Sequence, residues 1–222
     1  MRSAHVIVHT RALVATALLV MAMSAMAGSL TAAQVATVCG NAEDMSHCGR
    51  LIEDQQLKRF GGIATRDGDE LRVTLYPRGD VLFRDVVRPT AVESYTLWDV
   101  LPEINGVLLF VNQGDRASYL LLMRTNGRQF RLPAEPVVSP DRAYVVTADF
   151  CAFGCDNEVA LWRLTRDDVR KERVLRADGP WSDVTAEWSG PDEVVVDYTQ
   201  QGETDRRQLR LARNDARWRP PR

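Results

Sequence analysis

The sequence predicts an all-β protein of short antiparallel strands, preceded by one short N-terminal helix. After residue 62 the apolar residues follow the alternating spacing of strands almost to the end of the chain. Turn-forming pairs such as Asp67-Gly68 and Asn126-Gly127 separate the apolar runs, as they do in hairpins. Only residues 46–60 have a helical spacing. We therefore expect a helix that caps a larger β body.

The first 27 residues have the pattern of a cleaved secretory signal peptide. Two arginines, Arg2 and Arg11, precede an apolar run at 12–27 that ends in the small-x-small site Ala-Met-Ala. The run is shorter than the roughly 20 residues that span a bilayer, which favours cleavage over an uncleaved anchor. The expected mature protein is therefore periplasmic or secreted, without stable membrane insertion.

The mature chain would keep 195 residues, with 26 basic and 30 acidic side chains and a net charge of −4. No long run of one sign occurs, so no nucleic-acid partner is expected. Residues 28–61 are interpreted as a mobile terminus and the capping helix, and 62–222 as one β-rich domain. The oligomeric state stays open.

The helix expected at 46–60 has recognisable ends. Leu51, Ile52 and Phe60 can share one apolar face, basic residues lie in the last turn, and Gly61-Gly62 stops the helix.

All four cysteines would remain after cleavage, in an oxidising compartment that favours disulfides. Three connectivities are possible, and the short separations favour Cys39 with Cys48 and Cys151 with Cys155. The first bridge would staple the helix to the preceding segment, and the second would pin a hairpin tip. A four-cysteine zinc site would lack the usual C-x2-C pairs, and C-x3-C is one residue longer than the usual redox motif. No metal or cofactor is expected.

The apolar runs predict a series of strands that fall into repeated groups. Their expected ranges are 71–76, 81–87, 94–98, 106–111, 118–124, 128–132, 136–139, 143–149, 158–164, 173–175, 181–188, 193–199 and 207–211. Ser-Pro-Asp at 139–141 matches Gly-Pro-Asp at 190–192, about 50 residues later, with a hairpin after each. Such units must pack on one another to form a core. We expect a small or open propeller-like array of antiparallel blades, with a twisted β-sandwich as the alternative.

The stretch at 139–164, SPDRAYVVTADFCAFGCDNEVALWRL, resembles the Ser-Pro-Asp blade hairpins of WD40-like propellers of the TolB type. A weaker match to the same pattern occurs at 188–198, WSGPDEVVVDY, so the resemblance covers about two units. Arg142 replaces the glycine that usually follows Ser-Pro-Asp in that family. The resemblance implies a propeller architecture and a binding function, and it transfers no catalytic residue.

Few catalytic groups remain in the mature chain. His47 is its single histidine, which excludes a multi-histidine metal site, and no Gly-x-Ser-x-Gly or phosphate-binding loop occurs. Paired acids are the remaining option, as in glycoside hydrolases. The candidate acids are Asp149, Asp156 and Glu158, and Asp183 with Glu187. Asp156, Asn157 and Glu158 do not form a calcium-loop pattern.

The sequence therefore favours an exported, non-catalytic binding protein of the cell envelope, of the inhibitor or immunity type, whose partner is another envelope or secreted protein. The loop pinned by Cys151 and Cys155 would be its rigid insertion element. The loop residues are Ala152, Phe153, Gly154, Asp156, Asn157 and Glu158. The alternatives are a carboxylate-dependent envelope glycan hydrolase and an envelope assembly scaffold.

The five tryptophans are expected in the core. They are Trp98, Trp162, Trp181, Trp188 and Trp218.

Overall fold

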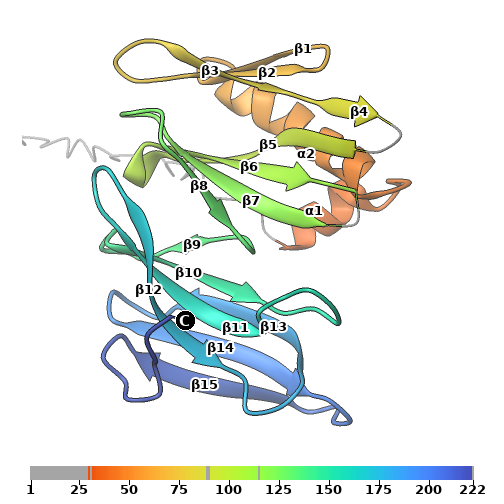
Figure 1. The fold of residues 1–222 in the computed structure, drawn as a ribbon. Coiled ribbons are helices and arrows are strands. Elements are labelled where there is room, and N and C mark those ends of the chain that lie inside the picture. Colours follow the sequence, from red (N-terminus) through yellow and green to blue (C-terminus); the bar gives the residue numbers. More distant parts are fainter. Residues whose placement is uncertain (1–29, 31, 89–90, 115, 222) are drawn as a thin grey trace, which may run out of the picture.

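The chain forms four small antiparallel sheets that stack face to face, with two helices at one side (Figure 1). The computed structural model describes residues 30, 32–88, 91–114 and 116–221, so the predicted signal peptide at 1–27 lies outside the described residues. The helices are α1 (Ala32–Cys39), α2 (Met45–Phe60) and the short 3-10 helix η1 (Pro102–Ile104). In the described part of the chain, no helix is long and apolar enough to cross a membrane.

Each sheet is a meander, because neighbouring strands follow one another in the chain. The first sheet contains β1 (Ala64–Asp67), β2 (Glu70–Thr74) and β3 (Asp80–Arg84). The second contains β4 (Val86–Arg88), β5 (Ala91–Leu101), β6 (Gly106–Asn112), β7 (Ala117–Met123) and β8 (Gln129–Leu132). The third contains β9 (Val137–Val138), β10 (Tyr144–Asp149), β11 (Glu158–Leu164) and β12 (Val169–Arg176). The fourth contains β13 (Trp181–Trp188), β14 (Glu193–Gln200) and β15 (Arg206–Ala212).

Three apolar layers hold the stack together. Leu71 and Phe83 of the first sheet pack against one face of the second. The other face of the second sheet, together with α2, packs against the third sheet around Phe110 and Val145. The far face of the third sheet packs against the fourth around Leu161 and Val196. The two inner sheets are therefore covered on both faces.

The position of a strand in the stack explains its sequence pattern. Every residue of β6, GVLLFVN, is buried, because β6 belongs to an inner sheet. By contrast, β2 and β14 alternate between buried and more exposed residues, because they belong to end sheets whose outer faces meet water. Ion pairs such as that of Arg210 with Glu193, 2.6 Å apart, make the outer face of the last sheet polar.

The β-rich prediction is confirmed, and the described residues form no closed propeller. Two expectations are wrong. The sequence predicted one N-terminal helix, and the described residues contain a second, α1, which packs on α2 and is tied to it by the Cys39 to Cys48 disulfide. The strand expected at 81–87 divides at Asp85, whose carboxylate accepts a hydrogen bond from the Tyr95 backbone, and the two parts join different sheets.

Helix α2 covers an edge of the second sheet. Asp44 caps its start by accepting a hydrogen bond from the backbone N–H of His47 at 2.8 Å. Strand β4 pairs only with the first residues of β5, which leaves the rest of that edge unpaired by a strand. Glu53 of α2 accepts from the Leu97 backbone, and Gln56 donates to the Trp98 carbonyl, each at 2.8 Å. These side chains satisfy backbone groups that a further strand would otherwise bind.

The tryptophans lie in or against the apolar layers, as expected. Trp98 and Trp218 are buried, and the three others pack against the clusters while partly exposed. Each indole N–H donates a hydrogen bond. The acceptors are Glu135 for Trp98, Thr147 for Trp162, Asp178 for Trp181, the Val137 carbonyl for Trp188 and the Ala212 carbonyl for Trp218.

Candidate functional site

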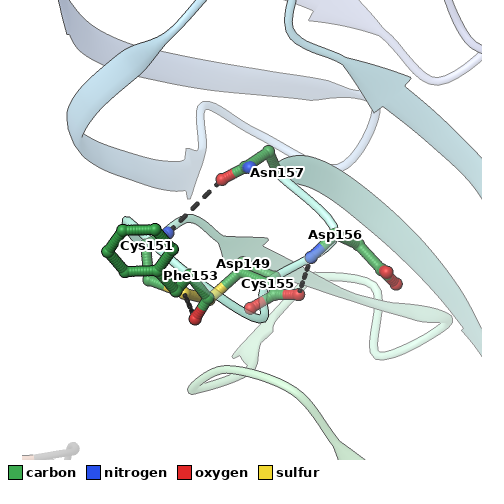
Figure 2. The surroundings of a disulfide bond; sticks show 6 residues. All are labelled: Asp149, Cys151, Phe153, Cys155, Asp156 and Asn157. Atoms are coloured by element: carbon green, nitrogen blue, oxygen red, sulfur yellow. Dashed lines mark hydrogen bonds between the residues drawn. A yellow bond between two sulfur atoms is a disulfide. The ribbon is translucent and has the colours of Figure 1, made fainter.

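The loop between β10 and β11 carries an aromatic side chain that projects into solvent. The Cys151 to Cys155 disulfide closes the loop, as the sequence predicted, and joins Cα atoms 5.6 Å apart. Gly154 has φ of +89°, a conformation that lets the chain reverse between the cysteines. Phe153 lies between the two cysteines, in the closed loop (Figure 2). Its side chain is 95% exposed, the most exposed large hydrophobic side chain of those described.

Hydrogen bonds at the base of the loop fix its shape. The backbone N–H of Asp156 donates to the Asp149 carboxylate at 2.9 Å, and that of Cys151 donates to the Asn157 side chain at 3.4 Å (Figure 2). The final pair of the β10 to β11 ladder places Asp149 opposite Glu158. The loop is therefore braced by a ladder, a disulfide and side-chain hydrogen bonds.

Three of the candidate acids are brought together at this base. Asp149 and Glu158 are only 8% and 4% exposed. Glu158 lies 2.7 Å from the Lys171 ammonium, which is 3.7 Å from Asp156. Burial raises the pKa of Asp149, and the nearby Asp156 and Glu158 carboxylates raise it further. Glu158 is therefore an internal brace rather than an exposed member of the binding loop.

The other sequence candidates lie on β13 and on α2. Asp183 and Glu187 are exposed on β13, where a bulge between Ser182 and Thr185 interrupts the strand register. His47 is exposed on α2, and its Nδ1 accepts a hydrogen bond from the Glu43 backbone at 3.3 Å. Within the described residues, no group of three or more histidine, cysteine, aspartate or glutamate side chains could hold a metal ion.

A groove of about 870 Å³ lies beside the disulfide loop, between the third and fourth sheets. The sequence did not indicate it. Its lining residues come from the end of β10, the disulfide loop, the start of β13 with the two residues before it, and the residue after β14. They are Ala148, Phe150, Cys151, Ala152, Asn157, Gly179, Pro180, Trp181, Ser182, Asp183, Val184 and Gln201.

The groove has an aromatic wall. The ring centroids of Phe150 and Trp181 are 5.8 Å apart and nearly parallel, and Trp181 stacks on Tyr198 at 3.9 Å. Asn157 and Asp183 have left-handed φ values of 51° and 50°, and both line the groove. Residues held in that conformation gather at functional sites. No local sequence pattern indicated either conformation.

The opposite end of the same two sheets carries the two Pro-Asp turns. The Arg213 guanidinium contacts both turn carboxylates: it lies 2.8 Å from Asp141 and forms a second ion pair with Asp192. It also lies over the Tyr144 ring, 4.8 Å from the ring centroid. Arg213 therefore ties the two repeated units together, which is a structural role.

Comparisons of the chain with protein-family models, with curated proteins and with solved structures found no match. The loop that carries Phe153 and the groove beside it are the features from which a function can be argued.

Proposed function

We propose that this protein is an exported, non-catalytic protein of the cell envelope that binds another protein through Phe153, as an inhibitor or immunity-type protein would. The observation that carries the proposal is the 95% exposure of this phenylalanine on a braced loop. Moving such a side chain from water into an apolar pocket is worth roughly 1.5–3 kcal/mol. A partner with an apolar pocket would therefore bind this protein more tightly through Phe153 alone.

The bracing of the loop supports an insertion role. A flexible loop loses conformational freedom on binding, and this loss reduces the affinity. Here the Cys151 to Cys155 disulfide and the Asp149 hydrogen bond restrict the loop before any partner arrives. The stacked sheets beneath it would act as a rigid platform, and we propose that they are the blades of an open propeller-like array.

The contacts of the buried acids support the non-catalytic part of the proposal. A glycoside hydrolase needs two carboxyl groups that face a bound sugar. Asp149 instead accepts a hydrogen bond from the loop backbone, and Glu158 pairs with Lys171. Neither acid lines the groove beside the loop.

Capture from an envelope extract tests this proposal. The mature chain, Phe153→Ala and the control Leu82→Ala would each be immobilised, since Leu82 is also exposed but belongs to the first sheet. We expect Phe153→Ala to reduce the amount of captured partner at least about tenfold and Leu82→Ala to leave it unchanged. Equal capture by wild type and Phe153→Ala would overturn the proposal.

The identified partner then separates an inhibitor from a scaffold. If the partner is an enzyme, adding the mature chain should lower its activity, and adding Phe153→Ala should lower it much less. A partner whose activity is unchanged by saturating mature chain would contradict the inhibitor role and support the assembly scaffold.

A further inference from the structure

We infer that the groove beside the disulfide loop binds a basic side chain, lysine or arginine, of the polypeptide that Phe153 contacts. This inference rests on the proposed function, since it describes a second contact with the same partner. The groove volume of about 870 Å³ lies within the range of roughly 300–1,000 Å³ typical of ligand pockets. It therefore has room for one long side chain and the backbone beside it.

The polar groups of the groove favour a donor over an acceptor. When it is ionised, the Asp183 carboxylate can only accept hydrogen bonds, whereas the side chains of Asn157, Ser182 and Gln201 can donate or accept. Asp183 is therefore the group that sets the preference. Of the described residues that line the groove, none is a lysine or an arginine. An acidic side chain would meet the Asp183 carboxylate without a compensating cation.

The charge of Asp183 is not neutralised within the fold. Among the described residues, no lysine, arginine or histidine side chain forms an ion pair with Asp183. The Arg206 guanidinium, from β15 of the same sheet, donates to the hydroxyl of Thr185 and not to Asp183. A cation from a partner would therefore be the first to pair with Asp183.

The aromatic wall fits the same ligand. Lysine and arginine are attracted to aromatic faces, and the planar guanidinium of arginine also stacks on them. Phe150 and Trp181 lie nearly parallel in the wall, with an angle of 11° between their planes. A purely apolar ligand would contact these rings but would leave the Asp183 carboxylate dehydrated and without a partner. A basic side chain can contact the aromatic rings and also pair with the Asp183 carboxylate.

Peptide titrations on the whole mature chain test the inference. The probes are three blocked glycine-serine pentapeptides whose central residue is arginine, citrulline or glutamate. The observable is the Trp181 indole N–H resonance, recorded by NMR. We expect the arginine peptide to shift it saturably, the citrulline peptide to bind at least about fivefold more weakly, and the glutamate peptide to leave it unchanged. Equal binding of the arginine and citrulline peptides would overturn the inference.

Two variants make the test specific. Asp183→Asn keeps a residue type that tolerates the left-handed conformation and should weaken binding of the arginine peptide at least about fivefold. Glu187→Gln is the matched control, because Glu187 is an exposed acid on the same strand outside the groove, and it should have no effect. Equal affinities for the two variants would contradict the inference.

The capture experiment keeps the two proposals distinguishable. If Phe153→Ala loses the partner while the arginine peptide fails to bind, the proposed function stands and the groove inference falls. If the arginine peptide binds at the groove while Phe153→Ala captures the partner normally, the role of Phe153 falls and the groove remains a cation site.

Discussion

Arg142 occupies a position that a glycine would fit better. It follows Ser-Pro-Asp and has φ of +60°, in the left-handed region that glycine adopts without strain. The turn is held from both sides, because the Asp141 carboxylate accepts hydrogen bonds from the Ser139 hydroxyl at 2.6 Å and the Ala143 backbone at 3.1 Å. The turn therefore imposes the strained conformation on the arginine.

Arg142→Gly should raise the free energy of unfolding by about 0.5–1 kcal/mol. The free energy gained when the left-handed strain is relieved exceeds the entropic cost of ordering glycine, which is more flexible in the unfolded chain. Urea denaturation of the mature protein measures this difference. Arg166→Gly is the control, because Arg142 and Arg166 line one small pocket and Arg166 does not have a left-handed φ. This control should not stabilise the fold. Loss of stability in Arg142→Gly would contradict the strain argument.

The raised pKa of Asp149 predicts that the stability of the fold depends on pH. Its pKa is raised in the folded protein, mainly by burial, so the folded state binds a proton more tightly than the unfolded chain does. The stabilising effect of this proton is complete below the ordinary aspartate pKa of about 4 and is lost as pH rises through the folded pKa. Asp149→Asn removes this titration and keeps an oxygen that can accept the Asp156 hydrogen bond.

The difference in stability between Asp149→Asn and wild type should therefore move in favour of the variant as pH rises from about 4 to 7. Urea denaturation across that range measures it. A difference that stays constant, or that moves in favour of wild type, would show that Asp149 is not held with a raised pKa.

Helix α2 shows how one element can complete a sheet. The Glu53 carboxylate is 2% exposed, accepts from the β5 backbone and lies 2.7 Å from the guanidinium of Arg66 on β1. It thus joins the helix to two sheets. Removing the carboxylate would leave the partly buried Arg66 guanidinium and the buried Leu97 N–H without this partner.

Glu53→Ala should lower the free energy of unfolding by about 3 kcal/mol, because a buried ion pair loses one member. Asp54→Ala is the matched control, since Asp54 is the next residue of the same helix and is exposed. Its effect should stay within about 0.5 kcal/mol. Thermal or urea unfolding of both variants checks the prediction, and similar losses in the two would refute the role assigned to Glu53.

Most strands and the main helix could be predicted, because their signals are local. The Asn126-Gly127 turn, the helix stop after Phe60 and the paired Pro-Asp turns each depend on a few neighbouring residues. The division of 81–87 between two sheets could not be predicted, because it depends on Asp85 meeting β5 in space. The groove was missed for a similar reason, since its two sides come from loops far apart in the sequence.

At the scale of the whole molecule, the stack covers much of its apolar surface and several of its strand edges. Helix α2 lies along β5, and the backbone of Arg219 exchanges two hydrogen bonds with Val174 of β12. Arginines line β15, a strand at the edge of the last sheet. An aromatic side chain is nevertheless left 95% exposed on the disulfide-braced loop, and our proposal assigns this side chain the contact with the partner.

Photo-crosslinking in living cells tests that contact most directly. Phe153 would be replaced by the photoreactive residue benzoylphenylalanine, and Leu82, which is exposed on the first sheet, would be replaced in the same way as the control. Irradiation should join position 153 to one protein of the envelope and give a discrete adduct, with no matching adduct from position 82. Absence of an adduct at position 153, or the same adduct from both positions, would contradict the claim that this loop binds the partner.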